Sequence, residues 1–300
     1  MRVSIQPLPD GKLIIDPIIQ SKPVKVKTIN ISEVIGAPLE RDIIAAYIAG
    51  YDKIELVGKR IKSEQKNIIR QLCYKLIGPE IIEESSSKVI LQDLLGPNDL
   101  PIKKGIYRMF LISNSMYKDS LKAFKKGDHD LAKDVKQRDD EVDRLYLLIS
   151  KQFRSITCGT GIPDTSESTI EEYHDFRMAA NPLERIADHA QQIAKTVENI
   201  NFEHSKETID LVDNAGKISQ QIIADSIESL FNSNTALANQ VFNKNDELRY
   251  YLNELGQVAM KLESYELIAP IQIIANSIQR VGEYGTNIAE MAINSAINQK

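Results

Sequence analysis

Two pairs of acidic residues are the side chains in this 300-residue sequence whose type and spacing could do chemistry. Asp139 and Asp143 stand four residues apart in one segment, and Glu184 and Asp188 stand four apart in another. Residues at this spacing share one face of a helix, so each pair points both carboxylates the same way. On a helical wheel, each pair lies about 100° from the apolar stripe of its segment, on the flank of the helix. If the two flanks meet, the four carboxylates converge on one surface groove.

A multivalent cation would relieve the repulsion between these carboxylates. Oxygen ligands alone suit iron, manganese, magnesium or calcium better than zinc, unless the imidazole of His189 joins them. The alternative is that these acids are solvated surface charges paired with guanidinium groups, for which Arg138, Arg144 and Arg185 are available. Spacing alone does not decide between a metal site and a solvated face.

No arrangement of residues in the sequence indicates catalysis. Glu171 and His174 form one Glu-x-x-His step, whereas a di-iron oxidase built in a helical bundle needs this motif on two helices. No Gly-rich phosphate loop stands out, and neither does a nucleophile with a histidine base. We therefore expect a protein without catalytic residues, with a bundle oxidase as a third and less favoured function.

The composition is typical of a helical protein rather than a membrane or nucleic-acid-binding one. Glycine (14 residues) and proline (11) are scarce and tryptophan is absent, which favours long helices over a turn-rich β fold. The net charge of −5 argues against a dedicated nucleic-acid-binding protein. No apolar run approaches the roughly 20 residues that span a bilayer, and no signal peptide is recognisable. We therefore expect a cytoplasmic protein without membrane insertion. Since the sequence has only two cysteines, Cys73 and Cys158, and they are far apart, we expect neither a disulfide nor a thiolate metal site.

Hydrophobic periodicity predicts the elements that must position the acidic pairs. Residues 1–97 alternate between short strands and short helices, which predicts a small α+β domain. After Gly96-Pro97-Asn98 the pattern changes to long helical periodicity, with Ser166 as the predicted N-cap of the third long helix. Six helices are expected, near residues 104–126, 128–157, 167–201, 205–232, 236–262 and 264–297.

The two halves of the helical region are copies of each other. The segment 135–142 aligns with 241–248, and the segment 181–189 aligns with 276–284, in the same order along the chain. We therefore expect a mainly α protein in which two tandem three-helix bundles follow the small α+β domain. The predicted domains are residues 1–97, 98–202 and 203–300.

The second copy does not keep the acidic residues. Its four equivalent positions hold, in the same order, Asn245, Arg249, Gln279 and Glu283. A single acid remains, and the guanidinium of Arg249 would itself neutralise the groove. We therefore expect a cation site in the first copy and none, or a much weaker one, in the second.

The segments Arg138–Leu145 (RDDEVDRL) and Glu184–Ala190 (ERIADHA) resemble the PhoU family of phosphate-uptake regulators. The resemblance extends from about residue 100 to the end of the chain, in duplicate, and implies two tandem three-helix bundles. Members of that family carry Glu/Asp-x-x-x-Asp motifs that bind iron or other multinuclear metal clusters on the protein surface. The resemblance implies iron before manganese, magnesium, calcium or zinc, and it implies as ligands Asp139, Asp143, Glu184 and Asp188. The altered second copy departs from the usual pattern of two clusters.

The N-terminal part resembles the longer PhoU-like proteins of archaea, which place an AbrB-type DNA-binding hairpin domain and a small α+β module before the helices. The segments 45–52 and 90–95 are similar to that module, and residues 3–17 are similar to the last hairpin of the AbrB-type domain. The loops that would carry its DNA contacts are missing from this chain. On this interpretation, Met1 is an internal methionine of a longer protein.

The resemblance implies a signalling adaptor that relays phosphate sufficiency and restrains phosphate uptake. Its partner would be the ATPase of the phosphate ABC transporter, or a sensor kinase. A metal in the groove would fix how the second and third helices pack, and so fix the surface shown to the partner. The alternative is a DNA-binding transcriptional regulator of phosphate genes that uses the AbrB-like N-terminus. A homodimer is expected, because the duplicated bundle has a broad face and AbrB-like hairpins work as intertwined pairs.

Overall fold

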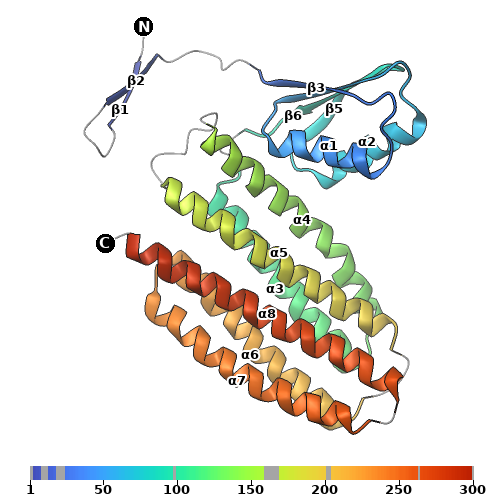
Figure 1. Ribbon diagram of the computed structural model, residues 1–300, viewed down its shortest axis with the longest axis vertical. Helices are drawn as coiled ribbons and strands as arrows, with labels where there is room; N and C mark the ends of the chain where they lie inside the picture. Colours follow the sequence, from blue (N-terminus) through green and yellow to red (C-terminus); the bar gives the residue numbers. More distant parts are fainter. Residues whose placement is uncertain are drawn as a thin grey trace.

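A computed structural model of the protein describes residues 3–7, 13–17, 24–96, 99–158, 169–200, 204–262 and 264–298. Strands and short helices come first along the chain and long helices follow, as predicted (Figure 1). Within the described residues, no helix is long and apolar enough to cross a membrane.

The N-terminal elements form a small sheet covered by two helices. The sheet contains the strands β3, β4, β6 and β5 in that spatial order; β3 and β4 are parallel, and the other neighbours are antiparallel. Helices α1 and α2 cover one face of it, and β1 and β2 pair separately as an antiparallel hairpin (Figure 1). The bounds are β1 (Val3–Pro7), β2 (Leu13–Pro17), β3 (Val26–Asn30), α1 (Ala37–Ile48), β4 (Lys53–Val57), α2 (Ser63–Lys75), β5 (Pro79–Glu84) and β6 (Lys88–Asp93).

The long helices agree with the predicted ranges to within a few residues. Their ends follow ordinary capping chemistry: Gly127 ends the first helix in the left-handed conformation (φ 62°), and the Asp128 side chain accepts a hydrogen bond from the backbone N–H of Leu131 at the start of the second. The bounds are α3 (Ile102–Lys126), α4 (His129–Thr157), α5 (Ile170–Glu198), α6 (Lys206–Phe231), α7 (Thr235–Met260) and α8 (Tyr265–Asn298).

The predicted start of α5 was wrong. Ser166, the predicted N-cap, lies outside the described residues, and Thr169 caps the helix. The Thr169 hydroxyl accepts a hydrogen bond from the backbone N–H of Glu172, and the Glu172 carboxylate accepts one from the backbone N–H of Thr169. This reciprocal capping box satisfies two backbone donors at the start of the helix.

The duplication appears in the burial of the long helices. α3 and α6 bury side chains at matching positions, and so do α4 and α7, and α5 and α8. An ion pair that was not predicted recurs at equivalent places: Arg138 of α4 pairs with Asp119 of α3 at 2.8 Å, and Lys244 of α7 pairs with Asp225 of α6. Each pair ties the second helix of a repeat to its first helix.

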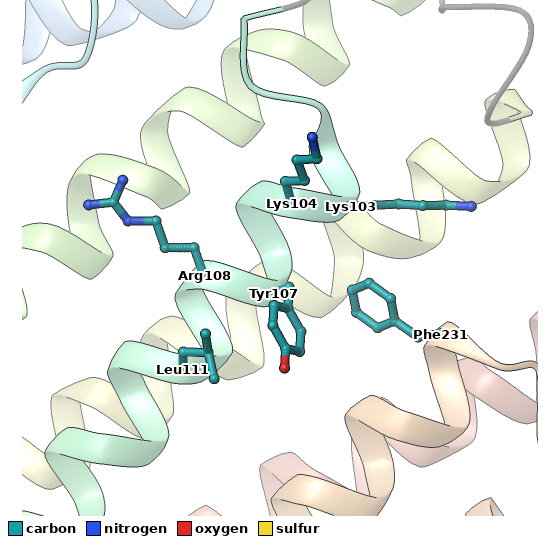
Figure 2. A pocket seen from close by; sticks show the side chains of 6 residues that line it. All are labelled: Lys103, Lys104, Tyr107, Arg108, Leu111 and Phe231. Carbon is teal, nitrogen blue, oxygen red and sulfur yellow. The ribbon is translucent and has the colours of Figure 1, made fainter.

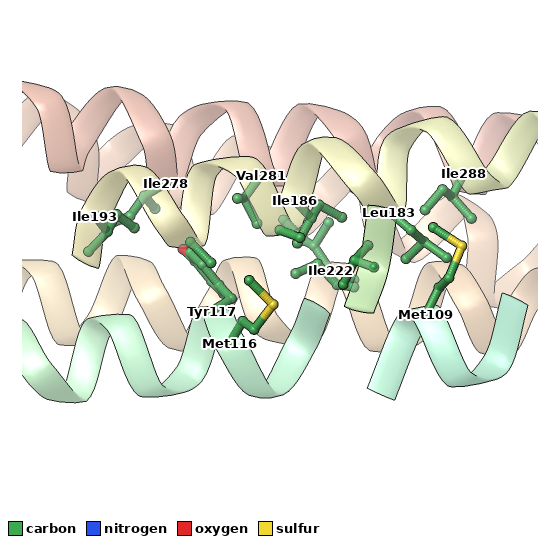
Figure 3. Packing of buried hydrophobic residues seen from close by; sticks show 14 of the residues in the cluster. Met109, Met116, Tyr117, Leu183, Ile186, Ile193, Ile222, Ile278, Val281 and Ile288 are labelled. Atoms are coloured by element: carbon green, nitrogen blue, oxygen red, sulfur yellow. The ribbon is translucent and has the colours of Figure 1, made fainter. Parts of the chain in front are cut away.

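One hydrophobic core joins the two groups of three helices. α5 and α8, the third helix of each repeat, pack against each other, and α3 and α6 contact them from one side. Figure 3 shows Leu183 and Ile186 of α5 among Ile222 of α6 and Val281 of α8, all of them fully buried. Burying apolar area at about 25 cal/mol per Å² makes this shared core the main source of stability for both repeats. The six long helices therefore form two groups of three, as predicted, but the two groups share one continuous hydrophobic core.

The α+β domain contacts the first bundle through α4. Leu147 of α4 packs against the core of the sheet domain. Lys151 of α4 forms an ion pair with Asp93 of β6, and each of these side chains is only 11% exposed. The Lys151 ammonium group also lies 4.7 Å from the centre of the Tyr47 ring, within the range of a cation–π interaction. α4 therefore carries both the first acidic pair and the α+β domain.

The close approach of α6 and α8 yields a testable prediction about stability. At Gly285 of α8, a Cβ atom would lie 2.4 Å from Cγ2 of Ile222, whereas at Gly256 of α7 it would meet nothing within 4 Å. We expect Gly285→Ala to destabilise the protein by about 1–3 kcal/mol, because the Ile222 methyl group is packed in the core. Gly256→Ala, the matched control, is expected to stabilise it by up to about 1 kcal/mol through helix propensity. Urea unfolding measures both, and equal effects would contradict the close packing.

Candidate metal centre

The structure brings the predicted ligands together on the facing flanks of α4 and α5. Asp139 and Asp143 lie on α4, Glu184 and Asp188 lie on α5, and the two helices pack against each other. The charges of these residues act on one another through the interface, as the pKa shifts below show. The helical spacing of each pair therefore places its carboxylates in one cluster at the edge of the first bundle.

Burial and mutual repulsion raise the pKa of three of these carboxyls. Burial, followed by the charges of Asp143 and Asp188, raises the pKa of Asp139 from 3.8 to about 6. Burial, followed by the charge of Asp188, raises the pKa of Glu184 from 4.5 to about 7, although the charge of Arg185 opposes this rise. The pKa of Asp143 is raised by burial and then by Asp188, even though part of its side chain is exposed. The cluster thus holds more negative charge than its surroundings neutralise.

One oxygen of Glu184 has no hydrogen-bond donor. Its Oε2 atom is buried and has no hydrogen-bond partner among the described residues, although Nε of Arg185 lies 3.4 Å away as an ion pair. The Glu184 side chain is only 18% exposed, so water reaches it poorly. A buried carboxylate oxygen without a donor is costly, and a cation is the ligand that would satisfy it.

Neighbouring side chains partly neutralise two of the other acids. Nη1 of Arg185 donates a hydrogen bond to Oδ2 of Asp188 at 3.0 Å. Asp139 accepts a short hydrogen bond from the amide of Gln191, and the Gln191 oxygen accepts one from the ammonium group of Lys195. Gln191 and Lys195 were not predicted as part of the site. They continue the row of Asp188 along α5 at spacings of three and four residues, which is the signal that could have identified them.

The arginines that were predicted as neutralising partners behave differently from one another. Arg185 reaches the cluster, whereas Arg138 pairs with Asp119 and Asp134 at 2.8 and 2.9 Å. Arg144 lies close enough to the Tyr47 phenol of the α+β domain to interact with it electrostatically. Of the three arginines that could neutralise the acids as paired surface charges, Arg185 therefore does so, whereas Arg138 and Arg144 interact with other residues.

The α+β domain and α8 also border the cluster. Lys75, at the end of α2, lies near enough to Asp143 to oppose the rise in its pKa that burial and Asp188 cause. His189 is directed at α8, where its Nδ1 atom lies 3.3 Å from the hydroxyl of Ser277. Burial, followed by the charge of Arg280, lowers the pKa of His189, so its imidazole is neutral at pH 7. In this arrangement His189 contacts the second repeat rather than the four acids.

The cluster is not a preformed coordination sphere. Within the described ranges, no three histidine, cysteine, aspartate or glutamate side chains are arranged to hold a metal ion. The hydrogen bonds that Asp139 and Asp188 accept would be exchanged for the cation on binding. The oxygen-rich residue types fit a hard or borderline cation, and so does the Glu184 oxygen that lacks a hydrogen-bond donor among the described residues. Metal binding by the four acids stays a prediction.

The equivalent positions of the second repeat are satisfied internally. Glu283 of α8 accepts a hydrogen bond from Nε2 of Gln279 at 3.0 Å through one oxygen, and from Nη1 of Arg280 at 2.6 Å through the other. Arg249 of α7 pairs with Asp246 at 3.6 Å. The retained acid therefore has a donor for each oxygen, which distinguishes it from Glu184.

Fold and site together define a class of protein: a tandem repeat of three-helix units with a shared core and one acidic cluster between two helices of the first repeat. The PhoU domain matches this sequence at residues 106–197 and 212–292, which covers both repeats and more than half of the chain. The chain belongs to the PhoU family. The match begins after the α+β domain and the β1–β2 hairpin, so the archaeal and AbrB-like kinship of that part stays a prediction.

Individual members of the family are distant relatives of this chain. A phosphate-specific transport system accessory protein PhoU homolog from Clostridium acetobutylicum is 24% identical over 194 residues, which cover 63% of this chain and 87% of that protein. The crystal structure of PhoU from Pseudomonas aeruginosa is 19% identical with a TM-score of 0.59, covering 66% of this chain and 96% of that one. The phosphate transport system regulatory protein PhoU from Streptococcus pneumoniae is 16% identical with a TM-score of 0.55, covering 65% and 92%. Both structures share the fold.

The raised pKa values predict how the stability of the metal-free protein depends on pH. A carboxyl whose pKa is higher in the folded than in the unfolded state stabilises the fold at low pH, and this stability is lost as pH rises through the folded pKa. For Asp139 and Glu184 the window runs from about pH 4 to about pH 7. With a chelator present, we expect the melting temperature to fall by about 2–4 °C across this window, which corresponds to on the order of 1 kcal/mol.

Glu184→Gln separates this effect from the general pH dependence of the protein. The amide cannot ionise, so the fall in melting temperature should shrink in this variant. Glu283→Gln in the second repeat is the matched control and should behave like the wild type. If Glu184→Gln and the wild type lose the same stability, ionisation of Glu184 does not destabilise the fold as its raised pKa requires.

Proposed function

We propose that this protein is a non-catalytic, cytoplasmic regulator of phosphate uptake. The relative from Clostridium acetobutylicum is named as an accessory protein of a phosphate-specific transport system, and the protein from Streptococcus pneumoniae as a regulatory protein of phosphate transport. Shared family membership supports the same role for this chain. The chemistry of the site also supports it, because the cluster offers cation ligands and no nucleophile paired with a base.

The observation that carries the proposal of a metal centre is the buried Oε2 atom of Glu184, which has no hydrogen-bond donor among the described residues and lies among other acids. The cation would be held by Asp139, Asp143, Glu184 and Asp188, with iron as the leading candidate and manganese, magnesium, calcium and zinc as alternatives. These ligands come from two helices, so one cation would link α4 to α5. Binding would then remove the repulsion that opposes their close packing.

The consequence for signalling passes through α4. This helix carries Leu147 and Lys151, which hold the α+β domain. A cation that fixes α4 against α5 would therefore fix the α+β domain relative to the bundle, and so select the surface that a partner sees. The proposed partner is the ATPase of the phosphate ABC transporter or a sensor kinase, and the proposed assembly is a homodimer. We also propose that residues 1–97, 98–202 and 203–300 are its structural units.

DNA binding through the β1–β2 hairpin stays a prediction. The hairpin side chains described as exposed are apolar, namely Val3, Ile5 and Leu13. A phosphate backbone is recognised by basic side chains, which these are not. The regulatory adaptor therefore has more support than the transcription factor.

The proposed function is tested by measuring metal content and partner recovery on the same samples. Wild-type protein loaded anaerobically with iron or manganese, desalted, and analysed by mass spectrometry should retain metal. Glu184→Gln and Asp143→Ala should each weaken retention at least about tenfold, because each removes a ligand. Immobilised wild-type protein should recover the purified transporter ATPase, and a chelator or either substitution should reduce that recovery.

Glu283→Gln is the matched control, since it removes a carboxylate at the equivalent place of the second repeat. It should keep both metal content and partner recovery. Unchanged metal in Glu184→Gln and Asp143→Ala would contradict the metal centre. Recovery of the ATPase that is the same with and without chelator would contradict the proposed link between the cation and the partner surface.

A further inference from the structure

A small hollow at the start of α3 combines an apolar floor with a basic rim. It has a volume of about 360 Å³ and is open to solvent (Figure 2). None of its lining residues belongs to the acidic cluster, so it is a separate feature of the first repeat. Its lining consists of Lys103, Lys104, Tyr107, Arg108 and Leu111 from α3 and Phe231 from the end of α6.

The floor exposes large apolar side chains to water. Tyr107 and Leu111 are each 50% exposed, although they lie one turn apart on a helix whose other face is buried. The Tyr107 ring meets the Phe231 ring edge-on, with 6.0 Å between their centres. Figure 2 shows the two rings side by side below the basic side chains. Apolar surface gathered at one spot in this way is typical of a binding site.

The rim is positive, and none of the described residues that line the hollow is acidic. Lys103 pairs with Glu172 of α5 at 3.3 Å, and Arg108 lies 3.8 Å from Glu141 of α4. The second of these pairs is exposed, with side chains 60% and 51% accessible, so it holds Arg108 only weakly. Lys104 is exposed, and it stands one helical turn from Arg108. Two cations at this spacing match two carboxylates at the same spacing on a partner helix.

The second repeat shows that the fold does not require this hollow. By the correspondence between α3 and α6, Asp213 stands where the first repeat has Tyr107, Lys217 stands where it has Leu111, and Lys125 takes the place of Phe231. Asp213 pairs there with Lys125 at 3.1 Å and with Lys217 at 2.9 Å. A self-neutralised polar group therefore fills the equivalent place. The exposed aromatic floor of the first repeat is thus not a consequence of core packing.

We propose that this hollow binds an acidic amphipathic helix of a partner protein. One large apolar side chain of the partner would lie on Tyr107, Leu111 and Phe231, while two carboxylates one turn apart would pair with Lys104 and Arg108. An anionic membrane surface fits less well, because polybasic membrane sites use about four to eight cations on one face, whereas three basic residues line this hollow. The inference goes beyond the proposed function and stands without the metal centre.

The absence of tryptophan from the sequence allows a direct test. Tyr107→Trp places a single fluorescent reporter in the hollow. The probe is a synthetic alanine-rich helix with a central phenylalanine flanked by glutamates one turn apart, titrated in the presence of a chelator. We expect a blue shift of the tryptophan emission and a dissociation constant on the order of 10–100 μM, as for a weak and transient interface. A probe with lysine in place of glutamate should not bind.

Charge reversal locates the interaction. In the Tyr107→Trp background, Lys104→Glu with Arg108→Glu should lower affinity at least about tenfold. Lys118→Glu with Lys122→Glu makes the same charge change on exposed positions of α3 outside the hollow, and should change affinity less than about threefold. If the first double variant does not fold, as judged by its melting curve, Lys104→Gln with Arg108→Gln replaces it and should still weaken binding clearly.

Three results would overturn the proposal. These are no change in emission at a millimolar concentration of the acidic probe, an equal loss of affinity in the two charge-reversed variants, and binding to vesicles containing phosphatidylserine without binding to the probe. Because a chelator is present throughout, failure of the metal centre cannot produce any of them.

Discussion

Helices α5 and α8 hold equivalent places in the two repeats and pack against each other at the centre of a shared core. Each of these helices also holds small residues on its buried face: Ala187 and Ala190 are buried on α5, and at the equivalent positions of α8 Gly282 lies against Leu248 of α7 and Gly285 lies against Ile222 of α6. A helix whose core face is fixed in this way has its other faces fixed as well. The row of α5 that carries Glu184 must then face α4 rather than α8.

The acidic cluster follows from that constraint. The core of the first repeat requires α4 to pack against α5, so hydrophobic burial holds like charges together that would otherwise separate. Burial first, and the charges of the neighbouring acids second, raise the pKa of Asp139 and of Glu184. Oε2 of Glu184 is buried without a hydrogen-bond donor among the described residues. A cation bound by the four carboxylates would relieve their repulsion locally. The same binding event would strengthen the contact between α4 and α5, and α4 extends this effect to the α+β domain through Leu147 and Lys151.

Duplication explains why the two repeats can differ so much in their surfaces. Most buried positions of α3 and α5 recur in α6 and α8, so the core sets few limits on the flanks. The first repeat exposes an acidic cluster and a basic aromatic hollow. The second repeat satisfies both equivalent places internally, with donors on each oxygen of Glu283 and with the ion pairs of Asp213. On this account the first repeat carries the binding chemistry and the second completes the shared core.

Much of the fold could be predicted from the sequence, because long amphipathic helices and a duplicated pattern are local signals. The acidic residues could be placed on one flank for the same reason, since the spacing of four residues is a property of a single helix. Features that depend on contacts between distant segments could not be predicted. These include the strand order of the sheet, the pairing of Arg138 with Asp119, and the direction of His189 toward Ser277.

The N-cap of α5 is a different case. Both Ser166 and Thr169 have the hydroxyl that a cap needs, and Glu172 three residues after Thr169 is the capping-box signal that distinguishes them. This signal is local, so the sequence alone is sufficient to predict the cap at Thr169. The hydrogen bond between Gln191 and Asp139 could be predicted only in part. The position of Gln191 on the same face of α5 as Asp188 follows from local spacing, but its contact with Asp139 depends on how α4 packs against α5.

An anomalous difference map from crystals grown with manganese or iron tests the central claim most directly. The account predicts a strong peak between α4 and α5, within bonding distance of carboxylate oxygens from both acidic pairs, and no peak of comparable height between α7 and α8. An empty groove in the first repeat, or a peak at Glu283 instead, would contradict it.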